Sequence, residues 1–246
     1  MKKYFLVIQL FIISTFQVNA QSTKIDTAAV YILDRMSSIM GDLKSCSVTI
    51  MSNYDVYNQT LGLVKQSNEE HLFMSGPDRL LASLEGDKGS RYYIYNGKTF
   101  SYYSLTKNHY AQINAPSTSI AMIDSMNKNY GIIFPAADFI YPTFVDDILG
   151  ETNNLELLGM TKVSGKDCYH IAGMSKGKTF QFWISEAPYY LPIKFEIIYT
   201  DKPMNPQFEE DYTDWQINPN LPDRMFEFSV PPNSKKIKLT PLSSKK

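Results

Sequence analysis

Carboxylates are the residues of this sequence whose spacing could support catalysis. Asp146 and Asp147 are adjacent, and Glu209, Glu210 and Asp211 form a second acidic run. Glycoside hydrolases use such paired carboxyl groups as a general acid and a general base or nucleophile. Successive side chains of a strand point to opposite faces, so Glu209 and Glu210 are not expected to converge. We therefore interpret both acidic runs as parts of a solvated face or loop.

Metal and cofactor signals are absent from the sequence. His71, His109 and His170 occupy strand-like segments without the close pairing of a zinc site, so we interpret them as hydrogen-bonded or surface side chains. The sequence contains no Gly-x-Ser-x-Gly elbow, no phosphate-binding Gly-x-x-x-x-Gly-Lys-Ser/Thr loop and no dinucleotide fingerprint. We expect no metal, no cofactor and no catalysis; an enzyme without a recognisable motif is the least favoured alternative.

The sequence contains two cysteines, Cys46 and Cys168, and does not determine whether they form a disulfide. An exported protein can form a disulfide, but the bond requires Cα atoms within ~7 Å of each other. The sequence does not supply that distance. A disulfide and a pair of buried free thiols are both compatible with the strand-like segments around these residues.

The first twenty residues have the pattern of a secretory signal peptide. Lys2 and Lys3 precede an apolar run from Tyr4 to Phe16, and Val18-Asn19-Ala20 matches a cleavage site of small residues. The apolar run is shorter than the ~20 residues that a membrane-spanning helix needs. We predict cleavage after Ala20, a periplasmic location and no stable membrane insertion.

The remaining composition is that of a folded globular protein. The chain is 43% hydrophobic and 20% charged over 246 residues, which is too apolar for intrinsic disorder and long enough to bury a core. The 24 Lys and Arg residues nearly balance 25 Asp and Glu residues, so the chain lacks the excess positive charge that binds a nucleic-acid backbone. We expect one domain over residues 21–239 and a flexible tail over residues 240–246.

Hydrophobic periodicity divides the mature chain into a helix, a run of strands, a helical insertion and a second run of strands. A helix is predicted over residues 25–43 with Asp26 as its N-cap, and another begins after Ser117 or Thr118. Short β-branched and aromatic runs predict about six strands over residues 46–113, with separate strands at 62–66 and 70–75. About five more strands are predicted over residues 155–215.

One hairpin is particularly clear. The segments Arg91–Tyr95 and Lys98–Tyr103 are joined by Asn96-Gly97, a pair that readily takes the positive φ angles of a two-residue turn.

This order of elements predicts an α+β fold rather than alternating βα units. A large antiparallel sheet must curl or be covered on one face. We expect a curved antiparallel sheet that forms an open half-barrel, with the N-terminal helix and the inserted helices covering its concave face.

Turn and aromatic motifs follow one another in a recognisable order over most of residues 45–235. They are Asn96-Gly97-Lys98-Thr99-Phe100, Tyr130-Gly131-Ile132, Pro135-Ala136-Ala137-Asp138, Gly165-Lys166-Asp167-Cys168-Tyr169-His170, Leu191-Pro192-Ile193-Lys194 and Asp214-Trp215. Together they resemble the DUF2092 family of predicted exported proteins, which is similar to the LolA and LolB superfamily of outer-membrane lipoprotein carriers and receptors. The resemblance implies a LolA-like half-barrel with a hydrophobic cavity that shelters acyl chains.

Aromatic residues distinguish this composition, with 17 Tyr, 14 Phe and 2 Trp. Phe180 and Phe182 face one way along their strand, whereas Gln181 and Trp183 face the other. A packed core between sheet and helices explains such alternation. The alternative is that part of this apolar surface lines a cavity for an acyl chain, whose burial contributes ~0.8 kcal/mol of binding free energy per methylene. The candidate cavity residues are Tyr93, Tyr95, Phe100, Tyr102, Ile123, Met126, Phe180, Phe182, Phe195 and Ile197.

The leading hypothesis is a non-catalytic periplasmic protein that binds or carries a hydrophobic ligand, such as a lipid or the acyl chains of a lipoprotein. In this hypothesis the segment 120–149 forms a lid, with Met122 and Met126 as adaptable contacts. The alternative is an envelope module for protein interaction or sensing that uses the same fold without transporting lipid.

Overall fold

A computed structural model describes residues 24–134 and 137–242 of the chain. The predicted signal peptide and its cleavage site lie outside the described residues, as do residues 243–246 of the predicted tail.

The described residues form one thirteen-stranded sheet and three α-helices, so the fold is α+β as predicted. The order across the sheet is β1-β8-β9-β10-β11-β12-β2-β3-β4-β5-β6-β7-β13. The strands in chain order are β1 (Lys24–Ile25), β2 (Ser45–Asn58), β3 (Gly62–Ser75), β4 (Arg79–Gly86), β5 (Arg91–Tyr95), β6 (Thr99–Ser104), β7 (His109–Asn114), β8 (Thr152–Val163), β9 (Lys166–Ser175), β10 (Lys178–Ser185), β11 (Pro192–Ile198), β12 (Gln207–Ile217) and β13 (Lys235–Lys236). The two terminal strands of this order do not pair with each other, so the sheet is open.

The sheet is mixed, whereas the sequence predicts an antiparallel one. Its central strands are antiparallel, but β1 pairs in parallel with β8 and β13 pairs in parallel with β7. Both edge strands contain only two residues, which is too short for a period-two pattern to reveal them. The second run of strands joins the first through β12 and β2.

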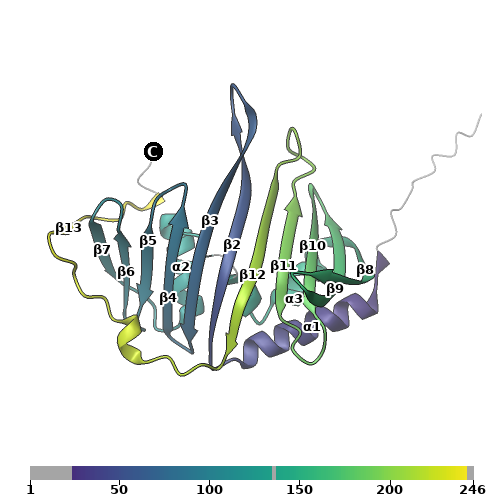
Figure 1. Cartoon of the computed structure of the whole chain (residues 1–246), viewed down its shortest axis with the longest axis horizontal. Coiled ribbons are helices and arrows are strands. Elements are labelled where there is room, and N and C mark those ends of the chain that lie inside the picture. Colours follow the sequence, from purple (N-terminus) through teal and green to yellow (C-terminus); the bar gives the residue numbers. More distant parts are fainter. Residues whose placement is uncertain (1–23, 135–136, 243–246) are drawn as a thin grey trace, which may run out of the picture.

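The strands β2 and β3 form a long hairpin that projects beyond the rest of the sheet (Figure 1). The prediction of separate strands at residues 62–66 and 70–75 is wrong, because β3 is continuous from Gly62 to Ser75. Ser67, within the predicted break, has partners on both sides: its hydroxyl donates to Asn53 Oδ1 at 2.6 Å, and its backbone amide donates to Asp87 Oδ2 at 2.7 Å.

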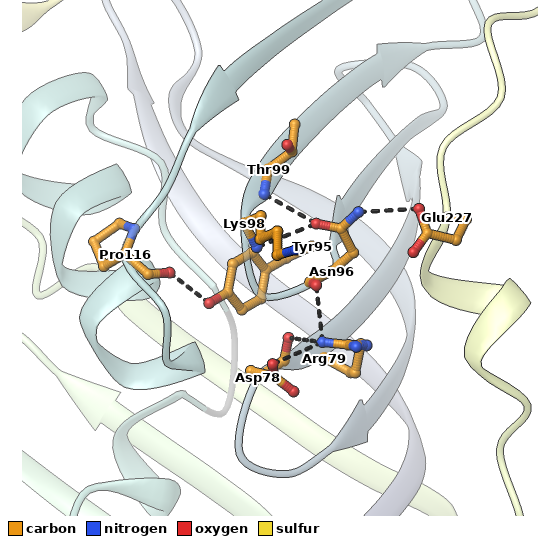
Figure 2. A network of polar contacts seen from close by, with 8 residues as sticks. All are labelled: Asp78, Arg79, Tyr95, Asn96, Lys98, Thr99, Pro116 and Glu227. Carbon is orange, nitrogen blue, oxygen red and sulfur yellow. Dashed lines mark hydrogen bonds and ion pairs between the residues drawn. The ribbon is translucent and has the colours of Figure 1, made fainter.

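The predicted β5–β6 hairpin is present, but its turn lies one residue later than expected. The Asn96 amide donates to the Thr99 carbonyl, so Gly97 and Lys98 are the central residues. Gly97 has φ +85°, which glycine adopts without strain, and Lys98 is not among the positive-φ residues. Figure 2 shows why: Asn96 Oδ1 accepts the amides of Lys98 and Thr99 at 3.2 and 2.9 Å, and therefore caps the turn.

Two of the helices begin where the sequence places their caps. α1 (Thr27–Asp42) follows Asp26, whose carboxylate accepts the Ala28 amide at 2.8 Å. α2 (Ser119–Tyr130) follows Thr118 and ends at Gly131, which has φ +67°. The insertion continues with a short 3-10 turn, η1 (Ala137–Ile140), and α3 (Phe144–Glu151), and a second 3-10 turn, η2 (Asp223–Phe226), precedes β13. None of the helices formed by residues 24–134 and 137–242 has the length and apolarity that a membrane span requires.

The core lies between one face of the sheet and these helices. Register places Val48, Leu72, Ala82 and Tyr93 side by side on neighbouring strands, and all four are buried. α2 and α3 lie behind the sheet in Figure 1, and α1 contacts α3, η1 and β8. The strands therefore bury mainly the side chains of one face, beneath the helices.

Both cysteines are buried free thiols rather than a disulfide. Cys46 pairs with Ile217 in the middle of the sheet, whereas Cys168 lies on β9, on the far side of β10 and β11. Burial raises the pKa of the Cys46 thiol to about 11.

Candidate functional site: a cavity between β10, β11 and the helical insertion

A cavity of about 730 Å³ lies between the helical insertion and strands β9 to β11. Its apolar lining consists of Ile123, Ile133, Phe134, Ala137, Phe144, Ile148, Phe180, Phe182, Phe195 and Ile197. Its polar lining consists of Asp124, Asn127, Lys128, Asp138, Tyr141, Asp147, Glu151, Thr152, Ser175 and Lys178. The hollow therefore has an apolar interior with charged and hydroxyl groups around it.

Two cross-strand pairs form the sheet side of the cavity. Phe180 pairs with Ile197, and Phe182 pairs with Phe195, so all four side chains share one face of β10 and β11. The rings of Phe182 and Phe195 are stacked with centroids 4.8 Å apart. Phe195 and Ile197 are only half-buried, because the cavity lies above them. This surface is apolar and presents no group that could take part in acid–base chemistry.

The insertion supplies the opposite wall. Phe144 of α3 meets the ring of Phe182 edge-on at 5.9 Å. Phe134, which follows α2, packs against Tyr93 at 5.4 Å and Phe100 at 6.2 Å. These contacts hold the insertion on the sheet on two sides of the cavity, one near β10 and the other near β5 and β6.

Half of the predicted cavity residues line this hollow. Ile123, Phe180, Phe182, Phe195 and Ile197 are in its wall. The other five are not among the lining residues.

The five remaining side chains belong to the packed core or border it. Tyr93, Tyr95, Phe100 and Met126 are buried in the core, and Tyr102 packs against it. A strand pattern indicates which side chains face the covered side of the sheet, but it does not distinguish those that meet the helices from those that meet an empty space.

Tyr95 illustrates the difference. Its hydroxyl donates to the Pro116 carbonyl at 2.5 Å, and the residue lies beside the turn network of Asn96 and Arg79 (Figure 2). Arg79 Nη1 donates to the Asn96 carbonyl at 2.8 Å, and the Asn96 amide group donates to Glu227 at 3.0 Å. Tyr95 therefore fastens the hairpin to the segment before α2.

The methionines expected to form an adaptable lid surface are also part of the core. Met122 and Met126 are 0% and 1% exposed, and both belong to the buried cluster beneath α2. Ile123, on the same helix, is the residue that reaches the cavity wall.

Three of the four acidic side chains around the cavity have partners. The fourth, Asp138, forms no ion pair or side-chain hydrogen bond with the described residues, and burial raises the pKa of its carboxyl. Tyr141 donates its hydroxyl to Asp124 at 2.7 Å, and Thr143 donates to Asp147 at 2.8 Å. Lys178 forms an ion pair with Glu151 at 3.2 Å. Burial, followed by the hydrogen bond and charge of Asp124, raises the pKa of the Tyr141 phenol, which therefore stays neutral.

A buried polar cluster lies next to the cavity, and the sequence did not reveal it. Glu210 is 3% exposed; its carboxylate accepts the hydroxyl of Tyr212 and that of Ser52, the latter at 3.3 Å. Glu70 is 1% exposed and neither of its carboxyl oxygens has a hydrogen-bond partner among the described residues. Glu70 and Tyr212 flank Ile50 on either side of β2.

Burial governs the protonation of this cluster. It raises the pKa of Glu210 to about 7 against the lowering effect of its hydrogen bonds to Tyr212 and Ser52. Burial and then the charge of Glu210 hold the pKa of Glu70 well above its usual range. Both carboxyls are therefore expected to be protonated under mildly acidic conditions.

The acidic run of β12 is thus only partly a solvated face, which corrects the interpretation drawn from the sequence. Glu209 and Asp211 point outward, where Lys194 lies 2.7 and 4.0 Å from their carboxylates. Glu210 points to the covered face. The prediction that the side chains of Glu209 and Glu210 point to opposite faces is confirmed. Because Glu209 faces solvent, Glu210 faces the core.

Two of the three histidines have ordinary side-chain partners. His170 lies 2.8 Å from Gln181 and stacks on Trp183, and His71 lies 3.2 Å from Glu69. Within residues 24–134 and 137–242, no group of three or more His, Cys, Asp or Glu side chains is arranged to hold a metal ion.

Comparison with known protein families identifies the family of this chain. The model of a family described as "Predicted periplasmic protein (DUF2092)" matches residues 29–240, which is most of the sequence. The chain belongs to this family. The family resemblance inferred from the motifs is therefore confirmed, and DUF2092 proteins are predicted to be periplasmic, in agreement with the localisation inferred from the sequence.

More distant similarities come from solved structures, and the search of curated proteins found no match. An uncharacterized conserved protein from Thermus thermophilus is 12% identical, with a TM-score of 0.48 over 85% of this chain and 98% of that one. The lipoprotein LppX of Mycobacterium tuberculosis is 12% identical, with a TM-score of 0.47 over 80% and 99%. LprF from Mycobacterium bovis is 14% identical, with a TM-score of 0.48 over 85% and 98%. These values are too low to transfer a ligand to this DUF2092 protein.

Proposed function

We propose that this DUF2092 protein is a non-catalytic periplasmic binding protein or carrier for a hydrophobic ligand, a lipid or the acyl chains of a lipoprotein. The observation that carries the proposal is the apolar cavity of about 730 Å³ between β10, β11 and the insertion. Its volume falls in the range of about 300–1,000 Å³ that is typical of small-molecule sites.

The chemistry of the lining favours a chain-like apolar ligand. Phe180, Phe182, Phe195 and Ile197 offer carbon surface along one side, and Ile123 faces them from α2. Each methylene buried there would contribute ~0.8 kcal/mol to the binding free energy, so an acyl chain could bind without directional polar contacts. Three of the four acidic side chains in the lining, Asp124, Asp147 and Glu151, are held by hydroxyl and lysine partners, and no described side chain is hydrogen-bonded to the fourth, Asp138.

In this proposal the open sheet acts as a LolA-like half-barrel, a single domain over residues 21–239, and the insertion acts as its cover. The five predicted residues in the cavity wall are the proposed ligand contacts. Tyr93, Phe100 and Met126 would act behind them, because they support Phe134 and Ile123.

A cavity-filling substitution tests the proposal. Ile197→Trp places a large ring in the space next to Phe180, and we expect loss of binding to a fluorescent fatty acid by tenfold or more. Ile198→Trp is the matched control, because the neighbouring residue of β11 points to the other face of the sheet. Equal binding by wild type and Ile197→Trp, with both proteins folded by circular dichroism, would contradict the proposed site.

A pull-down from the cell envelope distinguishes the alternative function. A lipid that co-purifies with wild type and is lost from Ile197→Trp supports the carrier. A stoichiometric protein partner that is retained by both, without lipid, would instead favour an interaction or sensing module.

A further inference from the structure

The cavity continues into a second hollow of different chemistry. A groove of about 530 Å³ adjoins it and shares Glu151, Ser175 and Lys178 with its lining. The groove is also lined by Lys176, Gly177, Tyr199, Asp201 and Lys202. Phenylalanine and isoleucine therefore give way, at one end of the cavity, to a surface with three lysines.

Backbone contacts hold these lysines together. The turn between β9 and β10 contains Lys176 and Gly177, and the Gly177 carbonyl accepts the amides of Thr200 and Asp201 at 2.9 and 3.3 Å. A Cβ atom at Gly177 would lie 2.6 Å from Asp201 Oδ2, so the turn packs closely on the β11–β12 loop. Lys202, in that loop, is thus fixed near the lysines of the neighbouring turn.

The groove has a surplus of positive charge. Its three lysines face two acids, Glu151 and Asp201, and Glu151 is already paired with Lys178. Lys202 lies 3.7 Å above the ring of Tyr199. In the part of the chain that the structure describes, neither Lys176 nor Lys202 forms an ion pair.

An unpaired hydroxyl marks the junction of the two hollows. Ser175 is 6% exposed and lines both, and its Oγ atom has no hydrogen-bond partner among the described residues. A buried polar group without a partner is unfavourable, and an ester or phosphate oxygen would satisfy it after a small side-chain adjustment. Two acids elsewhere around the cavity, Asp124 and Asp147, already accept hydrogen bonds from Tyr141 and Thr143.

We propose that the ligand is an amphiphile with an anionic, phosphate-type head group, whose chain lies in the apolar cavity and whose head group lies in the groove of Lys176, Lys178 and Lys202. The inference rests on the proposed function, because it needs the cavity to hold the chain. It adds the head group: charge complementarity selects anionic lipids over neutral lipids of the same chain length.

Binding of three palmitoyl lipids tests the proposal. Lysophosphatidylglycerol is anionic, lysophosphatidylcholine is zwitterionic and monopalmitoylglycerol is neutral, and all are used below their micelle concentration. We expect wild type to bind the anionic lipid most tightly. The K176Q/K202Q double variant should lose tenfold or more for that lipid and less than twofold for the neutral one, since lysines near a lipid head group contribute about 1 kcal/mol each.

The control variant is K166Q, which removes an exposed lysine of β9 that lines neither the cavity nor the groove. It should bind the anionic lipid as wild type does. Similar affinities of wild type for all three lipids, or an equal loss in K166Q, would overturn the head-group proposal and leave the carrier function intact. Inorganic phosphate that competes as strongly as the anionic lipid would assign the groove to a soluble anion and overturn it as well. Failure of every lipid to bind would instead reject the proposed function.

Discussion

Phe139 of η1 meets Tyr212 of β12 edge to face, with ring centroids 5.5 Å apart and ring planes at 73°. Phe139 also contacts Phe182 at 6.4 Å and Phe195 at 6.3 Å, two residues of the cavity wall. Tyr212 in turn donates its hydroxyl to buried Glu210. One ring therefore links the insertion, the cavity and the buried polar cluster.

Truncation of this ring should destabilise the protein strongly. Phe139 is 3% exposed, and Phe139→Ala removes contacts with four aromatic rings. We expect a loss of about 3–5 kcal/mol in the free energy of unfolding, measured with urea. Leu61→Ala, at a position that is 74% exposed, is the control and should change stability by less than about 0.5 kcal/mol. A similar small effect in both variants would show that Phe139 is not a packing centre.

The stability of the protein should decrease as the pH rises from 4.5 to 7. Glu210 has a folded-state pKa of about 7 against an ordinary value of 4.5, so the folded state retains a proton that the unfolded state releases in this window. The stabilisation is complete below pH 4.5 and is lost as the pH passes through 7, by about 3 kcal/mol for a shift of this size. Glu70, whose pKa is also raised, acts in the same direction.

Substitution of one carboxyl isolates this effect from other titrating groups. Glu210→Gln should flatten the difference in unfolding free energy between pH 4.5 and 7.5, as measured by urea titration at each pH. Glu209→Gln should leave it unchanged, because Glu209 faces outward beside Lys194. If wild type and Glu210→Gln show parallel pH profiles, Glu210 does not hold the proton.

The two thiols should be protected by burial rather than by oxidation. We expect Cys46 and Cys168 to react slowly with a thiol reagent in the native protein, since both are buried and burial raises the pKa of each thiol. Two thiols should titrate after denaturation without reductant, and reductant should leave the unfolding midpoint unchanged. Detection of no thiol in the denatured, unreduced protein would demonstrate a disulfide and contradict the structure.

The β5–β6 turn should tolerate no side chain at its first central position. Gly97 has φ +85°, and a Cβ atom there would lie 2.4 Å from Asp78 Oδ2. Gly97→Ala should therefore cost about 1–3 kcal/mol of unfolding free energy in a thermal or urea melt. Gly150→Ala is the comparison, because a Cβ atom at Gly150 would have no neighbour within 4 Å and its helical backbone suits alanine. Equal stability of Gly97→Ala and wild type would contradict the turn geometry.

Local patterns predicted the elements of this fold well. Asp26 and Thr118 cap helices as expected, because a side-chain oxygen next to an apolar period is a local signal. The β5–β6 hairpin was also evident, although its centre was one residue off, because the Asn96 side chain accepts the amides of Lys98 and Thr99 in addition to the backbone bond from Asn96 to Thr99. The edge strands β1 and β13 depend on long-range pairing and left no pattern in the sequence.

The site was less predictable than the elements. Alternation placed Tyr93 and Phe182 on the covered face equally well, but only Phe182 borders the cavity. The distinction depends on where Phe134 and Phe144 of the insertion come to rest, which no local period encodes. Glu210 was misjudged for a related reason: a charged residue type suggests solvent, and only the register with Ser52 shows that this one is buried.

Native mass spectrometry of the protein purified from its own cell envelope tests the central claim most directly. We expect a complex of one protein with one lipid for wild type and for Ile198→Trp, and a ligand-free mass for Ile197→Trp. A ligand-free mass for wild type after gentle extraction, together with no binding of added palmitoyl lipids, would contradict the claim.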